Sequence, residues 1–253
     1  MKQTVPSFLQ PGDTIGISAT ARFATTESLA IAKRVIEAEG FQCYYSPDIS
    51  VQQQQVAGTV AERVQHFNAL IHNPDIKAIW NVRGGYGSAE IVDLVDWGAL
   101  VAQPKWLIGF SDFTTFLCHG IQKGIATLHA PMPISFSITH PDALTATFDV
   151  LRGKEDALHC ALPKEVHGQV IAGNLSVISS ILGTPSLPNL DDCVLIIEDL
   201  DEYHYHLDRM LLALRRRGAF DKLRAVVLGE FSDIHDHDIP WGPDVQHSLR
   251  KHF

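Results

Sequence analysis

A lone serine lies at a sharp change of character in the segment WLIGFSDFTTFL, residues 106–117. A run of large apolar residues ends at Gly109, the polar pair Ser111 and Asp112 follows, and another apolar-rich run begins. This order predicts a strand, a tight turn and a helix, which is the local geometry that presents a nucleophilic serine at the end of a sheet. An oxyanion formed at that point would meet the amino end of a helix.

The turn differs from the GxSxG elbow of α/β-hydrolases, because GFSDF has Phe113 where the second glycine is expected. On local spacing alone, a serine in this place more often caps the helix that follows. The segment by itself therefore leaves two roles open for Ser111, a nucleophile and a helix cap.

Two other segments contain residues that could assist a nucleophile. The glycines of RGGYG, residues 83–87, follow a strand-like segment and could offer a backbone amide to an oxyanion, although a simple tight turn has the same composition. Glu198 ends the apolar run CVLIIE, where a carboxylate can orient a histidine or can serve in an ion pair or a helix cap. The nearby acids Asp199, Asp201 and Glu202 leave the choice of one carboxylate open.

The histidine-rich segments are weaker candidates. Residues 235–238, HDHD, are of metal-ligating types, but strand-like alternation puts only two of them on one side and no third ligand is evident. We therefore expect a solvated loop and no metal site. His204 and His206 precede an amphipathic helix and are expected on the surface or in packing, while the basic end of that helix, Arg215–Arg217, suits the helix dipole better than a nucleic acid.

Strands and helices alternate through the first half of the chain. The hydrophobic patterns and turn signals predict strands at 13–20, 41–47, 76–82, 105–110 and 126–131, with helices at 26–40, 60–74, 88–101 and 112–124. Such alternation is typical of an α/β fold, a mostly parallel sheet with helices on both faces. Ligands of these sheets bind beyond the carboxyl ends of the strands, where RGGYG and SDF both fall.

The alternation weakens after Met132, which indicates a second domain. We expect an N-terminal α/β domain at 1–136 that carries the nucleophile and a linker at 137–166. A smaller C-terminal domain, α/β or β-rich, is expected at 167–253 and would carry Glu198.

Composition narrows the functional class. The net charge of -9 over 253 residues argues against non-specific binding to nucleic acid or to an anionic membrane. The start of the chain lacks the apolar segment of a signal peptide, and no apolar run reaches the length of a bilayer. The cysteines lie far apart, so we expect reduced core thiols in a cytoplasmic protein rather than a disulfide frame or zinc site; they are Cys43, Cys118, Cys160 and Cys193.

Several segments together resemble the LD-carboxypeptidase family of serine peptidases, which includes murein tetrapeptide carboxypeptidases and microcin C self-immunity proteins. They are GFSDFTTF, NVRGGYGSAE, TLHAPM, AGNLSVISSILGTP and LIIEDLDEYHYHLDRML, and they occur in the family's order. The resemblance implies a Ser-Glu-His triad with Ser111 as the nucleophile and Glu198 as the acid. It also implies that the amides of Gly85 and Asp112 form the oxyanion hole, with Gly84 and Tyr86 at the substrate.

The resemblance implies hydrolysis of an L,D peptide bond in a murein tetrapeptide, with release of the terminal D-alanine, as a step of peptidoglycan recycling. It implies a homodimer that needs no metal or organic cofactor and binds a murein-derived peptide. Two alternatives stay open: a hydrolase that cleaves the amide of a microcin C-type peptide-nucleotide, and a non-catalytic peptide-binding protein.

The chain departs from the family's pattern at the catalytic histidine. In the family this histidine lies in a GH-type motif that follows a further strand, and nothing after Asp233 has that pattern. His247 and His252 fall in a segment that is predicted to be the preceding helix, and His129 is the nearest substitute. We therefore expect that the triad base is absent from this chain and that its carboxypeptidase activity is negligible.

Overall fold

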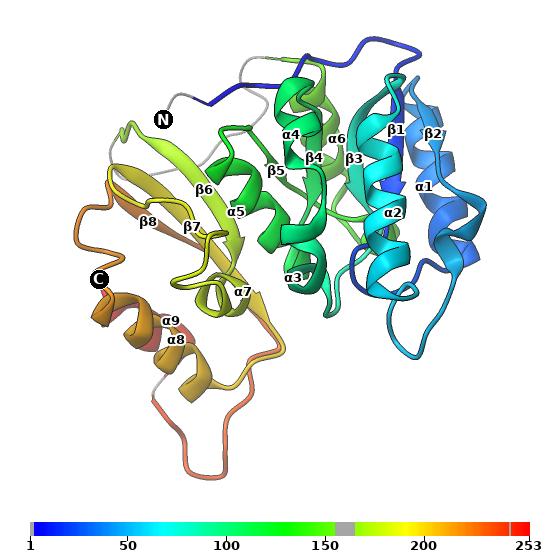
Figure 1. Ribbon diagram of the computed structural model, residues 1–253. Helices are drawn as coiled ribbons and strands as arrows, with labels where there is room; N and C mark the ends of the chain where they lie inside the picture. The colour runs from blue at the N-terminus through cyan, green and yellow to red at the C-terminus, as the bar shows by residue number, and fades with distance from the viewer. Residues whose placement is uncertain (1–2, 155–164, 243) are drawn as a thin grey trace. The chain divides into compact units, whose positions relative to one another are not determined.

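The structure is a computed structural model that describes residues 3–154, 165–242 and 244–253. The chain divides into two compact units, residues 1–161 and 162–253 (Figure 1). The first unit holds a five-stranded sheet and the second holds a three-stranded sheet.

The sheet of the first unit has the strand order β2-β1-β3-β4-β5, and each neighbouring pair is parallel. Its strands are β1 (Thr14–Ser18), β2 (Gln42–Tyr44), β3 (Ile76–Asn81), β4 (Trp106–Gly109) and β5 (Leu128–His129). Its helices are α1 (Thr26–Ala38), α2 (Val60–His72), α3 (Ser88–Ile91), α4 (Trp97–Ala102), α5 (Thr114–Gln122) and α6 (Pro141–Leu151). Short 3₁₀ turns complete the unit at η1 (Pro47–Ser50), η2 (Val92–Leu94), η3 (Ser111–Phe113) and η4 (Pro133–Ser135). The predicted fold class, a parallel sheet within an α/β fold, is confirmed.

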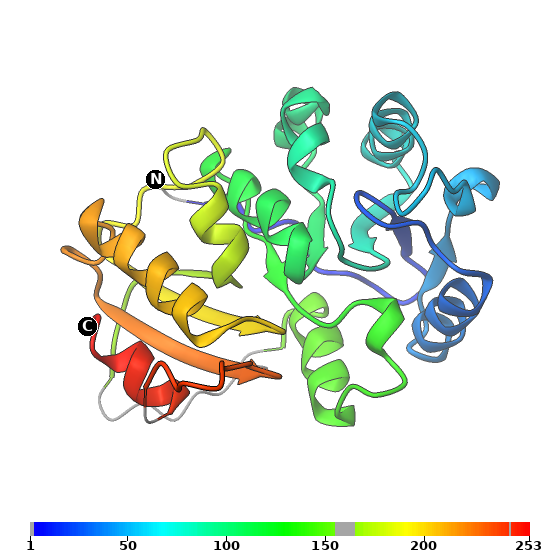
Figure 2. The ribbon, with the colours of Figure 1, turned by 90° about the horizontal axis from the view of Figure 1, so that it is seen from below.

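Helices cover both faces of this sheet, as Figure 2 shows. On one face, α1 and α6 pack against the strands through buried residues such as Ile36 and Phe148, which belong to one cluster with Trp80 of β3. On the other face, α2 to α5 contribute a separate buried cluster that includes Phe67 and Phe116. Each such side chain stabilises the fold by about 1.5–3 kcal/mol when it leaves water, so two apolar layers hold the strand ends in place.

Helix α6 lies inside the range 137–166 that the sequence assigns to a linker. Its residues Phe148 and Leu151 are buried in the core of the first unit, so this segment is part of that unit's packing. The sequence assigns this segment to a linker because its Pro, His and charged residues show no sheet pattern, but Pro141 stands at the first position of the helix, where proline is favoured. Residues 155–164 of the expected linker lie outside the described residues.

The helix predicted at 88–101 is interrupted. It consists of α3, the turn η2 and α4. The side chain of Asp96 accepts a hydrogen bond from the Ala99 amide and starts α4 anew, while the Trp97 indole donates to the Val92 carbonyl. These local hydrogen bonds compete with a continuous helix.

The second unit is also α/β with a parallel sheet, in the order β6-β7-β8. Its strands are β6 (Gln169–Asn174), β7 (Cys193–Leu200) and β8 (Ala225–Ser232), and its helices are α7 (Leu175–Ser180), α8 (His204–Arg216) and α9 (Val245–Arg250). The apolar residues Leu207, Leu211 and Leu214 of α8 are fully buried within the chain. This face of α8 is therefore intrachain core.

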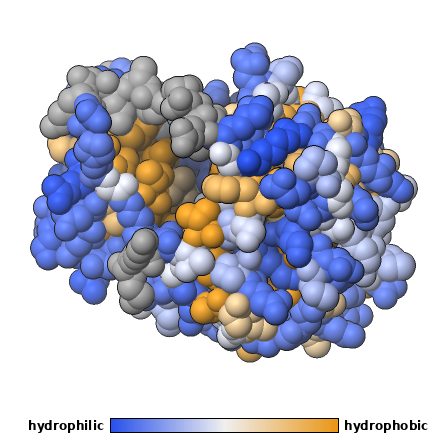
Figure 3. Space-filling view, turned by 90° about the horizontal axis from the view of Figure 1, so that it is seen from above, coloured by the Kyte–Doolittle hydropathy of each residue, from blue (hydrophilic) through white to orange (hydrophobic). Residues whose placement is uncertain are grey.

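The surface carries hydrophobic residues in a few patches between hydrophilic ones on the face that Figure 3 shows. Over the described residues, no helix combines the length and the apolar character that a bilayer crossing requires. Cys43, Cys118 and Cys193 are free thiols, and Cys160 lies outside the described residues.

Candidate active site

Ser111 lies directly beyond β4, at the first position of η3, and α5 follows. Its backbone φ is +57°, in the left-handed region that residues other than glycine rarely occupy. Neither η3 nor α5 has a side-chain cap, so the helix-cap interpretation of Ser111 is wrong. A strained residue between a strand and a helix is how a nucleophile elbow holds its hydroxyl clear of the sheet.

The RGGYG turn meets the serine because β3 and β4 are neighbours in the sheet. A side-chain carbon added at Gly84 would lie 2.7 Å from the Ser111 Oγ, which is too close for any non-glycine residue. Gly85 has a φ of +127°, and a side-chain carbon there would lie 2.6 Å from the Cγ of Arg22. Glycine is therefore required at both positions, and the backbone of residues 84–85 faces Ser111 without side chains.

An oxyanion hole requires backbone amides that donate no hydrogen bond within the protein, and the amides of Gly85 and Asp112 meet this requirement among the described residues. Each belongs to one of the two turns that meet at Ser111. Both donors are thus available to a ligand, and their role as the oxyanion hole stays a prediction.

The side chain of Asp112 has a structural role that the sequence did not indicate. Its carboxylate is buried and accepts a hydrogen bond of 2.8 Å from the Ser88 amide, at the start of α3. Burial raises the pKa of this carboxyl, and the hydrogen bonds from Ser88 oppose that rise. Asp112 thereby fixes the serine turn to the turn that follows β3.

Glu198 lies on β7 in the second unit and is half-buried. Burial and the charge of Asp199 raise the pKa of Glu198 to about 7, while the side chain of Asn174 lowers it. Asp199 instead supports the local structure, since it accepts hydrogen bonds from the Asn174 side chain at 2.8 Å and the Ser176 amide at 2.9 Å. A strongly shifted carboxyl at a strand end is typical of a functional group.

The other two acids of this segment pair with histidines of the same unit. Glu202 lies 2.8 Å from His206, and Asp201 lies 2.8 Å from His235. Among the acids near the end of β7, Glu198 is therefore the best candidate for the triad acid. Ser111 and Glu198 belong to different units, and their approach to one another stays a prediction.

Comparison with known proteins decides the family. The family profile for the LD-carboxypeptidase N-terminal domain matches residues 15–130, and the profile for its C-terminal domain matches residues 167–253. The murein tetrapeptide carboxypeptidase of Pseudomonas aeruginosa is 30% identical to this chain, over 94% of this chain and 81% of its own length. This chain belongs to the LD-carboxypeptidase family.

Other members of the family agree with this assignment. The microcin C7 self-immunity protein MccF of Escherichia coli is 29% identical, over 91% of this chain and 80% of its own length. The crystal structure of muramoyltetrapeptide carboxypeptidase from Oxalobacter formigenes superposes with a TM-score of 0.83 at 26% identity, and the match covers 94% of this chain and 83% of that one. The LD-carboxypeptidase family is one of serine peptidases, so a hydrolytic site is expected around Ser111.

The histidines of residues 204–206 and 235–237 contact other side chains of the second unit. The His237 ring stacks on Tyr203 with centroids 4.8 Å apart, and His204 is buried 3.5 Å from Asp236. Over the part of the chain that the structure describes, no group of three or more His, Cys, Asp or Glu side chains is placed to hold a metal ion.

Three further histidines, His129, His247 and His252, each follow a residue other than glycine in the sequence. His129 lies opposite Gly109 in the register of β5 and β4, with its ring 6.2 Å from that of Phe110. Burial lowers the pKa of His129 to about 4, so it accepts a proton poorly at neutral pH. His247 lies in α9 as expected, and His252 follows that helix with its Nε2 2.7 Å from Asp208.

Arg63 holds two loops of the site in place, a role that the sequence did not indicate. This buried α2 residue donates hydrogen bonds of 2.9 Å to the carbonyls of Thr20 and Gly87 and forms a 2.6 Å ion pair with Glu90. Asn81 acts beside it, since its amide nitrogen donates to the Arg83 carbonyl at 2.7 Å. A signal was present, because Arg63 stands on the apolar stripe of α2.

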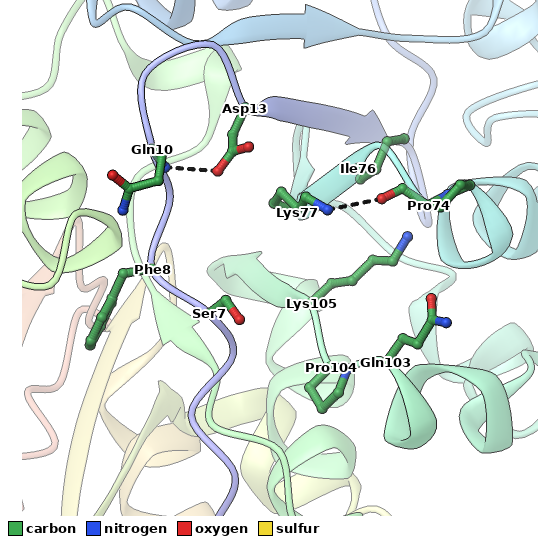
Figure 4. A pocket seen from close by; sticks show the side chains of 10 residues that line it. All are labelled: Ser7, Phe8, Gln10, Asp13, Pro74, Ile76, Lys77, Gln103, Pro104 and Lys105. Atoms are coloured by element: carbon green, nitrogen blue, oxygen red, sulfur yellow. Dashed lines mark hydrogen bonds between the residues drawn. The ribbon is translucent and has the colours of Figure 1, made fainter.

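A cavity of about 510 Å³ lies at the opposite, amino edge of the sheet (Figure 4). Lys105 and Lys77 line it, but Lys105 donates to the Leu70 carbonyl at 2.9 Å and Lys77 donates to the Pro74 carbonyl at 3.0 Å. Burial lowers the pKa of Lys105 to about 8. These ammonium groups satisfy carbonyls at and after the end of α2, so we assign the cavity no part in the chemistry at Ser111.

Proposed function

We propose that this protein is a serine carboxypeptidase that hydrolyses the L,D peptide bond of a murein tetrapeptide and releases the terminal D-alanine. The observation that carries the proposal is Ser111, a residue with a left-handed backbone whose hydroxyl lies against the bare backbone of Gly84. Membership of the LD-carboxypeptidase family supports the reaction, and the 30% identity to a murein tetrapeptide carboxypeptidase supports the substrate.

In the proposed mechanism, the Ser111 Oγ attacks the scissile carbonyl carbon. The amides of Gly85 and Asp112 bind the oxyanion, and each such donor contributes on the order of 10²–10³ in kcat. A histidine takes the proton from the serine and gives it to the departing amine of D-alanine, and water then hydrolyses the acyl-enzyme. Glu198 orients that histidine and stabilises its charged form. Gly84 and Tyr86 contact the substrate beside the serine.

The histidine is the one member of the triad that this sequence does not supply in the family's motif. None of its thirteen histidines follows a glycine in a GH-type motif. Loss of the base in a serine triad lowers kcat by roughly 10⁶ in the subtilisin series. We propose that the 253-residue chain turns over negligibly, whereas a version extended through a GH-type segment, the histidine-complete protein, is active.

We also propose a cytoplasmic homodimer that acts in peptidoglycan recycling. The family resemblance supports the assembly and the pathway, and the free thiols of Cys43, Cys118 and Cys193 support a reducing compartment.

Two other functions stay open. The 29% identity to MccF favours hydrolysis of an amide in a peptide-nucleotide. A protein that binds a peptide without cleaving it is the other alternative.

Calorimetric binding to the Ser111→Ala variant separates the two substrates without any turnover. We expect a murein tetrapeptide to bind at least tenfold more tightly than aspartyl sulfamoyl adenosine, a ligand of MccF. The reverse order would favour the peptide-nucleotide hydrolase, and no binding of the tetrapeptide would overturn the proposed function. Binding by the wild-type chain, with no cleavage in the histidine-complete protein, would favour the non-catalytic alternative.

A further inference from the structure

Two arginines lie at the same edge of the sheet as Ser111. Arg22 follows β1 and Arg83 follows β3, and these strands are neighbours. Both side chains are half-buried. Because the carboxyl ends of parallel strands share one edge, both cations lie on the ligand-binding side of the first unit.

Close contacts connect Arg22 to the nucleophile through two glycines. A side-chain carbon at Gly84 would lie 2.7 Å from the Ser111 Oγ, and one at Gly85 would lie 2.6 Å from the Arg22 Cγ. The stem of Arg22 therefore rests on the residue whose amide we assign to the oxyanion hole, and Arg83 directly precedes this glycine pair.

Neither guanidinium group has a carboxylate partner among the described residues. Arg22 donates to a neutral acceptor, the Gln55 Oε1, at 2.6 Å. Burial and the charge of Arg22 lower the pKa of Arg83. Other arginines of the unit differ, since Arg63 and Arg152 each form an ion pair with a glutamate.

A half-buried pair of like charges without a counter-ion is unfavourable unless a ligand supplies the opposite charge. The substrate of a carboxypeptidase carries such a charge, because its terminal carboxylate lies three bonds beyond the scissile carbonyl carbon, within about 4 Å. The planar guanidinium fork matches a carboxylate in geometry as well as in charge.

On the basis of the proposed function, we propose that Arg22 and Arg83 form the subsite that binds the terminal carboxylate of the D-alanine residue. This subsite restricts cleavage to the last residue of the peptide, since an internal peptide bond presents no carboxylate at that distance. It adds a specificity determinant to the triad and the oxyanion hole.

Calorimetry on the Ser111→Ala background tests the subsite with two ligands, the murein tetrapeptide and the same peptide with a C-terminal amide. We expect the acid to bind at least tenfold more tightly than the amide. Arg22→Gln and Arg83→Gln should each weaken binding of the acid by about 10- to 100-fold, the loss of a charged hydrogen bond, and change binding of the amide by less than threefold. Arg34→Gln, an exposed arginine of α1, is the matched control and should change neither affinity.

Thermal unfolding of each variant shows that the fold is retained, and Arg22→Lys and Arg83→Lys, which keep the charge, should retain part of the preference for the acid. Equal binding of acid and amide, or equal weakening of both by the arginine variants, would overturn the inference alone. Failure of both ligands to bind would overturn the proposed function and, with it, this subsite.

Discussion

The position of the Ser111 hydroxyl depends on the absence of a side chain at Gly84, in the turn that follows the neighbouring strand β3. The oxygen occupies the space where a Cβ of residue 84 would lie, at 2.7 Å from that carbon. The left-handed φ of +57° leaves the serine little freedom to move aside without a change of the whole turn. The nucleophile is therefore positioned as much by Gly84 as by its own backbone.

Substitution Gly84→Ala should displace the hydroxyl and lower kcat of the histidine-complete protein by about 100-fold, the effect of a misplacement of about 1 Å. Steady-state release of D-alanine measures this. The control is Gly98→Ala in α4, where a Cβ would meet only the Asp96 Oδ1 at 3.3 Å. Unchanged kcat in Gly84→Ala would show that Ser111 is not the reacting group.

Glu198 should make the free energy of unfolding depend on pH. Its pKa is raised from 4.5 to about 7 in the folded chain, so the folded state binds the proton more tightly than the unfolded state. This contribution is fully present below about pH 4.5 and is lost as the pH rises through 7. Urea unfolding of Glu198→Gln at pH 5 and pH 8 should show a smaller loss of stability between these values than the wild type.

The matched control is Glu230→Gln, which changes an exposed glutamate of β8 and should keep the wild-type difference. The same pH dependence in Glu198→Gln and in the wild type would contradict a raised pKa at Glu198.

At the scale of the elements, helix α2 holds two loops of the site together. Arg63 donates to the Thr20 carbonyl beyond β1 and to the Gly87 carbonyl beyond β3. Its ion pair with Glu90 reaches α3, whose first amide is bound by Asp112. The Gly-rich turn is therefore fixed from α2 on one side and from the serine turn on the other.

Substitution Arg63→Met should lower the free energy of unfolding by about 2–4 kcal/mol, because it leaves two buried carbonyls without a donor and removes the ion-pair partner of the exposed Glu90. Urea unfolding measures this loss. Lys33→Met is the control, since Lys33 belongs to an exposed pair with Glu37 at 3.9 Å and should cost less than about 1 kcal/mol. Equal small effects would show that Arg63 does not clamp the loops.

Much of this arrangement could be predicted from the sequence, because it depends on local patterns. The apolar run before Gly109 and the polar pair after it predict the strand, turn and helix around Ser111, and strand adjacency then brings RGGYG to the same edge. The interruption near Asp96 and the packing of α6 could not be predicted, because a capping hydrogen bond and tertiary burial of Phe148 decide them. The role of Arg63 depends on carbonyls 43 and 24 residues away.

At the scale of the whole molecule, the homodimer stays a prediction that the family resemblance supports. The apolar face of α8 does not add to it, because Leu207, Leu211 and Leu214 are already buried within the chain. Light scattering of the purified protein at micromolar concentration should give twice the chain mass of 27.9 kDa. A mass of one chain at every concentration would contradict the dimer.

The central claim is a serine nucleophile on the first unit, an acid on the second and a histidine from a GH-type segment. If the base is what the 253-residue chain lacks, exogenous imidazole should restore part of the hydrolysis, because a free imidazole can take the proton of Ser111. The same addition should have no effect on the Ser111→Ala variant.

The most direct test is the release of D-alanine from an L,D murein tetrapeptide, measured for the 253-residue chain and for the histidine-complete protein, each with and without Ser111→Ala. The predicted result is negligible release by the 253-residue chain and turnover by the histidine-complete protein that Ser111→Ala abolishes. Robust turnover by the 253-residue chain that Ser111→Ala abolishes would show that an internal histidine is the base. Release that persists without the Ser111 hydroxyl would contradict the account at its centre.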